Sequence, residues 1–314
     1  MSAIRTAVVG VGAMGKWHAE KFAALPESKL VAVVDADDAR ASDVAEPLGA
    51  SPEADFKALI GKVDAVSIAT PTSSHFEIAS TLLDNGIHVL IEKPIAATID
   101  EARELVELAE SKGLIIQVGH LERFNPAIAA IRDKVRNPQF IESNRIAPYK
   151  PRSLDVSVVL DLMIHDIDLI HSLADSPMTE VDAVGRSIFS DSIDVANARL
   201  RFENGCVANV TSSRISMKTE RSLRIFQADG YLSVDMHNKA VTCYSKRGSG
   251  PVKGPEDVEV EKQSFGDSDA LLEQARAFLE SVAGGPPPLV SGRTAMEALR
   301  TATEISKMVG SDLG

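Results

Sequence analysis

The chain has 314 residues, of which 44% are hydrophobic and 25% charged, and its formal net charge is −12. This length predicts two domains, the composition is typical of a globular protein, and the acidic balance disfavours nucleic acid, whose phosphates would be repelled. Two cysteines are too few for a disulfide scaffold, and the sequence shows neither a signal peptide nor an apolar run that could span a membrane. We therefore expect a cytoplasmic protein without nucleic-acid or membrane partners.

In the first third of the chain, short apolar segments alternate with helical ones. The expected strands cover residues 6–9, 30–34, 65–69, 87–91 and 114–118. The expected helices cover residues 13–25, 37–48, 74–85 and 98–112, the last opened by a capping box of Thr98 and Glu101 and ended by Gly113. Strands that are apolar throughout and separated by helices indicate a parallel sheet with helices on both faces.

The pattern changes after about residue 119. Helices are expected at 126–135 and 161–173, and a strand at 140–147. Between residues 179 and 244, strands separated by turn signals such as Asp229-Gly230 indicate an antiparallel meander with one exposed face. Two helices, 267–282 and 293–308, follow. We therefore expect an α+β domain over residues 121–314 with a largely antiparallel open sheet, whose last helix could pack back on the first domain.

The segment Gly10-Val11-Gly12-Ala13-Met14-Gly15 fits the pattern G-x-G-x-x-G directly after a strand and at the start of a helix. In this context the first glycine permits a tight turn, the second lets the backbone approach a pyrophosphate, and the third lets helix and strand pack closely. Free N–H groups at the helix start would supply an anion site. The motif predicts a dinucleotide-binding Rossmann domain over residues 1–120. The expected cofactor contacts in this turn are Gly10, Gly12, Ala13, Met14 and Gly15.

Asp35 ends the second strand, about 20 residues after the glycine turn, where a carboxylate accepts hydrogen bonds from the adenosine ribose. A carboxylate there would repel a 2′-phosphate, and Ala36 follows it in place of an arginine, although Arg40 is near in sequence. NAD is therefore the expected cofactor in preference to NADP. The alternative is that the glycines form a plain turn and that Asp35 caps the next helix.

Two further motifs follow the third and fourth strands: Ile68-Ala69-Thr70-Pro71-Thr72 with His75, and Glu92-Lys93-Pro94. Together with the glycine pattern, they resemble the Gfo/Idh/MocA family of oxidoreductases, and the resemblance covers essentially the whole chain. It implies a Rossmann domain followed by a substrate domain.

The resemblance also implies roles for these residues. Lys93 would project into the active site and contact both cofactor and substrate. The other expected cofactor contacts are Thr70, Pro71 and Thr72 on the nicotinamide side, with His75 and Glu92 near it. Because Glu92 and Lys93 are neighbours at a strand end, we expect their side chains to point in opposite directions, and Pro94 could follow a cis bond.

A second motif of the family, D-x-G-x-H, lies on a helix of its second domain. Asp161-Leu162-Met163-Ile164-His165 matches the first and last members. Side chains four positions apart share a helix face, so Asp161 and His165 could act together, joined by Asp168. The motif glycine is Met163 here, and we expect this departure to change the space near the nicotinamide.

These residue types suit the oxidation of a secondary alcohol, in which the hydroxyl loses its proton as hydride leaves the carbon. Histidine titrates near neutrality, so His165 is the expected base, while Lys93 would stabilise the negative charge that develops on the oxygen. Asp161 would orient the substrate or the histidine. Two alternatives stay open: Lys93 is the base, if its pKa is strongly lowered, or it is an ordinary exposed lysine.

Other polar residues have weaker signals. His165 and Asp161 share helical spacing with Asp168 and His171, but a metal needs further ligands and none is evident, so we expect no metal. The remaining histidines are expected to be structural or solvent-facing: His18, His75, His120 and His237. Arg123 and Asn125 follow the fifth strand and are expected to bind substrate. A basic cluster suits a diphosphate but is equally consistent with a solvated hairpin loop: Arg214, Lys218, Arg221 and Arg224.

Residues 160–170, 197–214 and 223–235 are similar to the family branch that oxidises UDP-N-acetylglucosamine to its 3-keto form. The resemblance therefore implies an NAD-dependent dehydrogenase acting on a CH–OH group of a small sugar or sugar-nucleotide substrate. A free sugar or an inositol is the alternative substrate, and a non-catalytic dinucleotide-binding regulatory protein is the alternative of another class. Since the family commonly associates through the outer face of the second-domain sheet, we expect a homodimer or homotetramer.

Overall fold

The computed structural model describes residues 3–150, 156–248 and 250–311, and the chain divides into two compact units. The first unit consists of Met1–Leu121 and Asp269–Glu297, and the second of Glu122–Ser268 and Ala298–Gly314. The sequence pattern predicted that residues 121–314 form a single domain. The segment Asp269–Glu297 instead belongs to the first unit, because the apolar side chains of its helix are buried in that unit's core.

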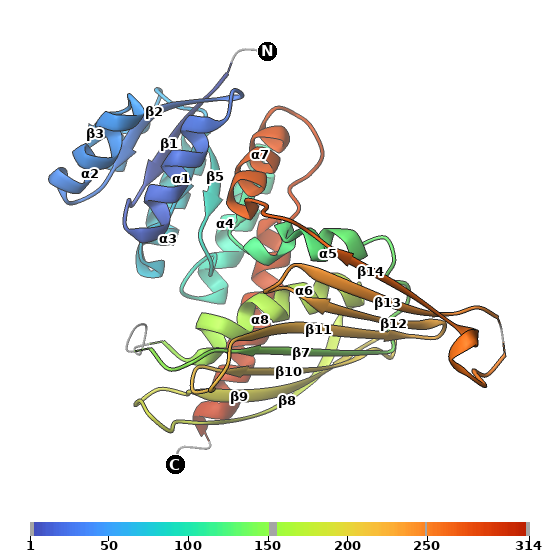
Figure 1. The fold of residues 1–314 in the computed structure, drawn as a ribbon. Helices are drawn as coiled ribbons and strands as arrows, with labels where there is room; N and C mark the ends of the chain where they lie inside the picture. The colour runs from blue at the N-terminus through green and yellow to red at the C-terminus, as the bar shows by residue number, and fades with distance from the viewer. Residues whose placement is uncertain (1–2, 151–155, 249, 312–314) are drawn as a thin grey trace. The chain divides into compact units, whose positions relative to one another are not determined.

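The first unit is built on a six-stranded parallel sheet in the order β3-β2-β1-β4-β5-β6 (Figure 1). Its strands are β1 (Ile4–Val9), β2 (Ser28–Val34), β3 (Ser51–Glu53), β4 (Ala65–Ile68), β5 (His88–Ile91) and β6 (Ile116–Val118). Their carboxyl ends are in register, since Val9 pairs with Val34 and Ile68, and Ile91 pairs with Ile68 and Val118. The segments that follow these strands therefore leave the sheet along one edge, where open parallel sheets bind ligands.

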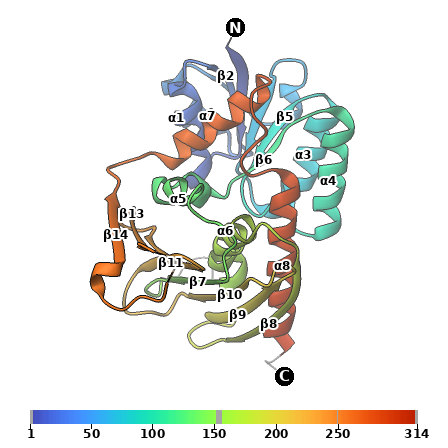
Figure 2. The same ribbon diagram turned by 90° about the vertical axis from the view of Figure 1, so that its right-hand side faces the viewer.

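Helices cover both faces of this sheet (Figure 2). They are α1 (Ala13–Ala24), α2 (Asp38–Ala45), α3 (His75–Asp84), α4 (Ile99–Lys112) and α7 (Ala270–Val282). On one face α1 packs on α7, where the rings of Phe22 and Phe278 meet edge to face with centroids 6.4 Å apart. On the other face α3 packs on α4, whose predicted capping box of Thr98 and Glu101 is confirmed.

The second unit contains an eight-stranded sheet in the order β14-β13-β12-β11-β7-β10-β9-β8, antiparallel except between β7 and β10. Its strands are β7 (Phe140–Ile146), β8 (Met178–Arg186), β9 (Val195–Phe202), β10 (Val207–Ser213), β11 (Glu220–Gln227), β12 (Gly230–Asp235), β13 (Ala240–Lys246) and β14 (Val258–Ser264). Burial alternates along β7 and β9, so one face of the sheet is buried and the other is partly exposed. The predicted α/β Rossmann domain followed by an α+β domain is confirmed.

Helices of the second unit bury their apolar side chains on the inner face of this sheet. They are α5 (Pro126–Ile131), α6 (Ile164–Ala174) and the part of α8 (Gly292–Ser311) that follows Glu297. A π-helical turn, η5 (Val159–Met163), precedes α6, so the helix expected at 161–173 is irregular where it begins. None of the helices in the described part of the chain has the length and apolar content to cross a membrane.

Two strands, β3 and β14, were not expected from the sequence. β3 has only three residues, one of them Pro52, so it carries no periodic pattern. β14 reads VEVEKQS and does alternate, but most of its residues are exposed. Both strands lie at a sheet edge, where a strand has one neighbour and needs fewer apolar residues.

Candidate active site

The glycine turn joins β1 to α1. Gly10 has a φ of 82°, a conformation that residues with a side chain rarely adopt. A Cβ on Gly15 would overlap the carbonyl oxygen of Gly10, so α1 approaches the turn this closely only with glycine at that position. A Cβ on Gly12 would meet no protein atom within 4 Å, so the space in front of this residue is open. The turn thus combines close helix packing with the open backbone that a pyrophosphate site requires.

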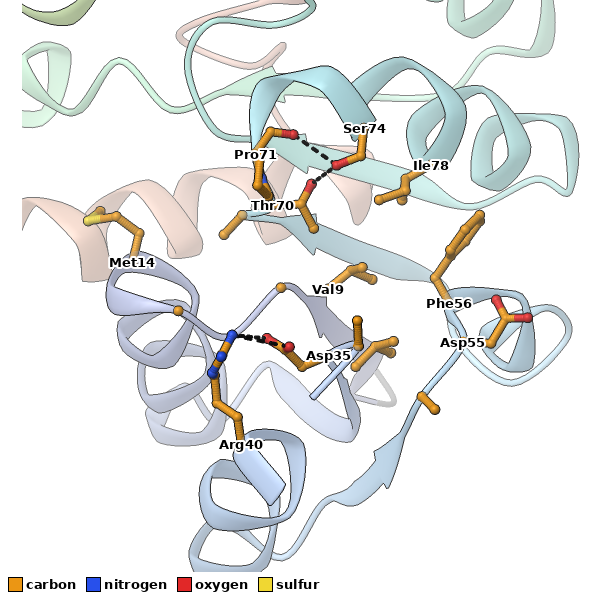
Figure 3. A pocket seen from close by; sticks show the side chains of 16 residues that line it. Val9, Met14, Asp35, Arg40, Asp55, Phe56, Thr70, Pro71, Ser74 and Ile78 are labelled. Carbon is orange, nitrogen blue, oxygen red and sulfur yellow. Dashed lines mark hydrogen bonds and ion pairs between the residues drawn. The ribbon is translucent and has the colours of Figure 1, made fainter. Parts of the chain in front are cut away.

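A cavity of about 710 Å³ opens beside this turn (Figure 3), a volume typical of ligand pockets. Several of the predicted cofactor residues line it: Gly10, Gly12, Met14, Asp35, Ala36, Arg40, Thr70 and Pro71. The other residues predicted to contact the cofactor are outside this lining: Ala13, Gly15, Thr72, His75, Glu92 and Lys93. The structure therefore brings the residues expected around the adenosine and pyrophosphate, from the segments after β1 and β2, next to two residues expected on the nicotinamide side, from the segment after β4.

Asp35 follows β2 and lines the cavity with a carboxylate that is almost buried. Its Oδ2 accepts a hydrogen bond from the backbone N–H of Val11 at 2.8 Å, and its Oδ1 accepts one from Asp37 at 3.0 Å. Arg40 Nη1 lies 3.3 Å from Oδ1, an ion pair that Figure 3 shows. Asp37 caps α2, so the alternative that Asp35 is the helix cap is wrong. The carboxylate is held next to the glycine turn instead.

Part of the cavity wall was not expected from the sequence. Ala54, Asp55 and Phe56 contribute to it from the segment between β3 and the short helix η2 (Phe56–Leu59), and Ser74 and Ile78 from the start of α3. The Phe56 ring is the large apolar surface among these residues (Figure 3). The aromatic residue that follows the second strand–helix unit could have indicated this part of the cavity wall. It was not recognised because β3, the strand before it, shows no periodic pattern.

Lys93 follows the end of β5, and its bond to Pro94 is cis, as the motif suggested. The carboxylate of Glu92 reaches toward α1, where its Oε1 lies 3.0 Å from Nε2 of His18, while its Oε2 accepts a hydrogen bond from the N–H of Lys93 at 3.2 Å. Burial raises the pKa of the Glu92 carboxyl, but the hydrogen bonds and charges of His18 and Lys93 together outweigh burial, and the pKa lies below its ordinary value. Glu92 is therefore an ionised carboxylate next to the Lys93 backbone.

The four histidines expected to be structural or solvent-facing divide into three buried ones and one exposed one. His18, His75 and His120 are each 1% exposed, so of the two roles expected for them the solvent-facing one is wrong. His237 is exposed. The Nδ1 of His18 lies 2.9 Å from Ser67 Oγ on β4. His75 opens α3, and its two ring nitrogens lie 2.9 Å from the carbonyl oxygens of Pro94 and Thr70.

In the second unit, Asp161 lies in the π-helical turn and His165 in the first turn of α6, and both are half-buried. Met163, which replaces the motif glycine, is fully buried in the hydrophobic core of this unit. Its side chain packs in this core, and the expected change of the space near the nicotinamide stays a prediction. Within the described residues, no group of three or more His, Cys, Asp or Glu side chains is arranged to hold a metal ion.

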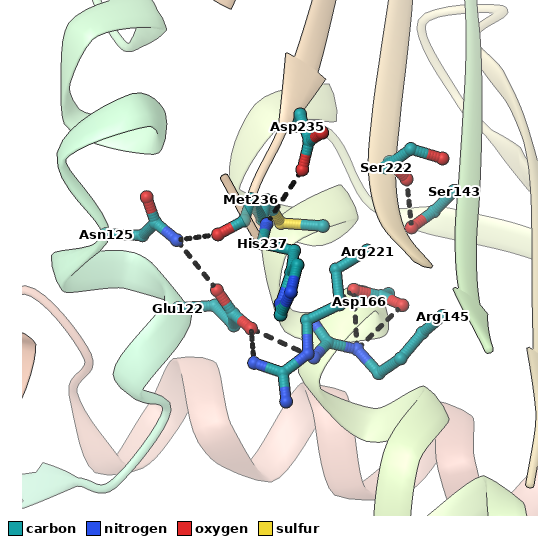
Figure 4. A network of polar contacts seen from close by, with 10 residues as sticks. All are labelled: Glu122, Asn125, Ser143, Arg145, Asp166, Arg221, Ser222, Asp235, Met236 and His237. Atoms are coloured by element: carbon teal, nitrogen blue, oxygen red, sulfur yellow. Dashed lines mark hydrogen bonds and ion pairs between the residues drawn. The ribbon is translucent and has the colours of Figure 1, made fainter. Parts of the chain in front are cut away.

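A buried ionic network anchors the beginning of α6 to the sheet (Figure 4). Arg145 on β7 donates hydrogen bonds to Asp166 at 2.8 Å and to Glu122 at 2.9 Å. Burial lowers the pKa of Arg145, but the charges of the two carboxylates outweigh it and the net shift is upward. Burial also raises the pKa of Asp166, yet the two-pronged contact with a charged guanidinium marks it as an ionised partner. The network fixes the helix turn that carries His165.

The two residues expected to bind substrate after the fifth strand differ in their surroundings. Arg123 Nε lies 3.7 Å from Oδ2 of Asp168, and both side chains are largely buried. Asn125 caps α5, and its amide donates to Glu122 and to the carbonyl of Met236 (Figure 4). These bonds engage the amide within the fold, which argues against the predicted contact of Asn125 with substrate.

The basic cluster expected as a possible diphosphate site is dispersed. Arg214 is buried and donates to the carbonyl oxygens of Val156 and Ile193. The other three cations each pair with a different carboxylate: Lys218 with Glu220, Arg221 with Glu122, and Arg224 with Glu142. Arg221 and Arg224 lie three positions apart on β11 and therefore face opposite sides of the sheet, while Arg214 follows β10 and Lys218 precedes β11.

Comparison with known proteins places this chain in context. Residues 4–120 match the family model described as an oxidoreductase family with an NAD-binding Rossmann fold, and residues 132–233 match the GFO/IDH/MocA C-terminal domain. A UDP-N-acetylglucosamine 3-dehydrogenase from Acidithiobacillus ferrooxidans is 39% identical over 96% of both chains. The solved structure of a UDP-N-acetylglucosamine 3-dehydrogenase from the same organism aligns with this chain over 100% of both chains, with a TM-score of 0.92. A scyllo-inositol 2-dehydrogenase (NAD(+)) from Bacillus subtilis is 27% identical over 92% of this chain and 89% of its own.

The two glycines of the turn allow a matched test of the cofactor site. Gly12→Ala should leave the unfolding midpoint unchanged, because its Cβ meets no protein atom, yet weaken NAD binding at least about tenfold, roughly 1.4 kcal/mol, by filling the space for the pyrophosphate. Gly15→Ala should lower the unfolding midpoint even without cofactor, because its Cβ overlaps Gly10. Calorimetry and thermal unfolding measure both; unchanged NAD affinity in Gly12→Ala would contradict the assignment.

Proposed function

Because the chain belongs to the Gfo/Idh/MocA family of oxidoreductases, we propose that it is an NAD-dependent dehydrogenase that oxidises the 3-hydroxyl of UDP-N-acetylglucosamine to a ketone. The observation that carries the proposal is the whole-chain identity to a UDP-N-acetylglucosamine 3-dehydrogenase, which exceeds the identity to the inositol dehydrogenase. An inositol or a free sugar is accordingly the second candidate substrate.

The cofactor site supports NAD in preference to NADP. The open space before Gly12 and the cavity beside it fit a dinucleotide, and the Asp35 carboxylate suits ribose hydroxyls while repelling a 2′-phosphate. Arg40 is engaged with Asp35 and Asp37, so its charge is already balanced by two carboxylates. When bound, NAD accepts the hydride that leaves the carbinol carbon.

The protein's own residues would remove the hydroxyl proton and stabilise the charge on the oxygen. In the proposed mechanism, His165 removes the hydroxyl proton as hydride leaves, and Lys93 donates a hydrogen bond to the same oxygen as negative charge develops there. Asp161 would orient the substrate or the imidazole. Lys93 lies in the first unit and His165 in the second, so their meeting at the substrate is part of the proposal.

The outer face of the eight-stranded sheet suits association with a second copy of the chain. Phe226, Tyr231 and Tyr244 stack along β11, β12 and β13 on this face, with successive ring centroids 5.3 Å and 4.3 Å apart. All three are half-buried, and aromatic rows of this kind are enriched in interface cores. We therefore propose a homodimer or homotetramer formed through this face.

The proposed substrate is tested by following NADH at about 340 nm with purified enzyme, NAD and a set of candidates: UDP-N-acetylglucosamine, UDP-glucose, N-acetylglucosamine and myo-inositol. We expect turnover with UDP-N-acetylglucosamine and the highest kcat/KM for it. Tight NAD binding without turnover on any of these would favour a regulatory protein, and faster turnover of myo-inositol would favour the second substrate class.

Two substitutions test the roles assigned to the chemistry. Lys93→Met should lower kcat by about 100- to 1,000-fold, as loss of one donor to a developing oxyanion does, with little change in NAD affinity. His165→Asn should lower kcat by about 100- to 10,000-fold and remove the rise of kcat with pH that a neutral imidazole base produces. If kcat were unchanged in either variant, that residue would have no part in the mechanism.

Asp35 and Arg40 together test the cofactor preference. Asp35→Ala should weaken NAD binding about tenfold and strengthen NADP binding, because a repelling carboxylate is lost and Arg40 is released from its ion pair. The matched control is Asp35→Ala with Arg40→Ala, which should lose the gain in NADP affinity. Titration of each coenzyme by fluorescence measures both affinities; an unchanged ratio would assign the preference to other residues.

The oligomer proposal is tested by sedimentation velocity of the wild type and of Tyr244→Asp. A charge placed in the aromatic row should dissociate the assembly, because the carboxylate would be buried without a partner. A wild type that sediments as a monomer would contradict the proposal. The substitution Tyr149→Asp, outside this row, is the control and should leave the assembly intact.

A further inference from the structure

The backbone of Lys93 is bordered on its N-terminal side by a chain of buried hydrogen bonds. Ser67 on β4, His18 on α1 and Glu92 after β5 follow one another at 2.9 Å and 3.0 Å, and Glu92 then accepts the N–H of Lys93 at 3.2 Å. Ser67 is fully buried and His18 is 1% exposed. Glu92 also packs against Gly119, where a Cβ would come within 2.9 Å of the carboxylate. Glu92 is thus held between α1 and the segment after β6, and β4 in turn holds His18.

The hydrogen bond between His18 and Glu92 has a fixed direction. A carboxylate only accepts hydrogen bonds, so Nε2 of His18 must donate to Glu92. The hydroxyl of Ser67 then donates to Nδ1 of a neutral His18 or accepts from Nδ1 of a charged one, so this hydrogen bond forms in both cases. Each polar group in the chain is satisfied in this way, and fully satisfied buried networks are rigid.

The C-terminal side of Lys93 has a second histidine. His75, also 1% exposed, lies 2.9 Å from the carbonyl oxygen of Pro94 through Nδ1 and 2.9 Å from that of Thr70 through Nε2. A carbonyl oxygen only accepts, so a neutral imidazole donates its one N–H to Pro94 or to Thr70, and in either case the ring packs between the segment after β5 and the segment after β4. Thr70 lines the cavity beside the glycine turn, so this histidine connects the cofactor site with the lysine segment.

We propose that His18, acting through Glu92, and His75, acting through the carbonyl of Pro94, are positioning residues that together fix the backbone of Lys93. The proposal rests on the proposed function, since it assigns them to the placement of the catalytic lysine. These contacts give a physical reason for the Glu-Lys-Pro motif. The residues on both sides of the lysine are anchored, so the side chain that carries the ammonium group extends from a fixed backbone position.

The arrangement also links lysine placement to the cofactor. His18 lies on α1, whose first turn faces the proposed pyrophosphate site, and His75 holds Thr70 on the cavity wall. Both histidines therefore reach Lys93 from segments that the dinucleotide would contact. A displacement of about 1 Å in such a group can lower turnover about 100-fold, so modest loosening of either anchor should be measurable.

The first experiment needs no turnover. Hydrogen–deuterium exchange of the enzyme without cofactor, followed by mass spectrometry, reports the N–H of Lys93, which is bonded to Glu92. Glu92→Ala should increase exchange in the peptide that contains Lys93 by on the order of tenfold, because the acceptor is lost. Glu92→Gln should keep it slow, since its amide oxygen can accept from Lys93 while its NH2 donates to a His18 of the other tautomer. Unchanged exchange in Glu92→Ala would overturn the role of Glu92.

The second experiment is a double-mutant cycle on kcat with Lys93. Glu92→Ala and His75→Ala should each lower kcat about 10- to 100-fold at nearly constant NAD affinity, and Glu92→Gln should recover most of the loss. In a Lys93→Met background, each should have little further effect, because a positioning residue acts only through the lysine. If the fold-decreases in kcat of the anchor variant and of Lys93→Met multiply in either double variant, that residue has a general structural role. The proposal then fails for that residue.

The two proposals fail in different ways. If the wild type reduces NAD with none of the sugars, the proposed function is overturned, while the exchange experiment still decides whether Glu92 holds the lysine backbone. If the wild type turns over and the cycles are multiplicative, the function stands and the positioning roles are overturned. His18→Ala, measured by exchange at Lys93, should resemble Glu92→Ala; a wild-type exchange rate would remove His18 from the chain of contacts.

Discussion

The in-register carboxyl ends of the parallel strands are the constraint on which the first unit depends. Val34, Val9, Ile68, Ile91 and Val118 pair side by side across five strands. The next residue of each strand therefore begins a loop at the same edge of the sheet, and these loops carry the Asp35 carboxylate, the glycine turn, the Thr70 segment and the Lys93 motif. No single loop makes the site; the hydrogen-bond register of the sheet assembles it.

Once the loops are gathered at one edge, short-range polar contacts set their conformations. Asp35 accepts from the backbone of the glycine turn, and Glu92 accepts from the backbone of Lys93. A carboxylate that accepts backbone N–H groups in a buried position is held in one orientation, because any other leaves a buried polar group without a partner. The same principle operates in the second unit, where Arg145 ties Asp166 to the sheet beside His165.

The corrections found in the structure have a common origin. Asn125 was expected to bind substrate, and a diphosphate site was one of two interpretations of the basic cluster that includes Arg214. The polar groups of both residues instead bond to backbone carbonyls and neighbouring side chains within the fold. In each case the residue type was compatible with a ligand, but the contacts that satisfy it come from residues distant in sequence, which a linear pattern does not reveal.

The sequence by itself determined the Rossmann domain, the α+β domain, the glycine turn, the capping box of α4 and the family, because these depend on local periodicity, on backbone conformations that only glycine permits and on short motifs. Only the tertiary structure decided that Asp269–Glu297 belongs to the first unit, that Phe56 lines the cavity, and that His18 and His75 border Lys93. These features arise from contacts between segments far apart in the chain. Such contacts are set by strand register and core packing, and neither leaves a local mark in the sequence.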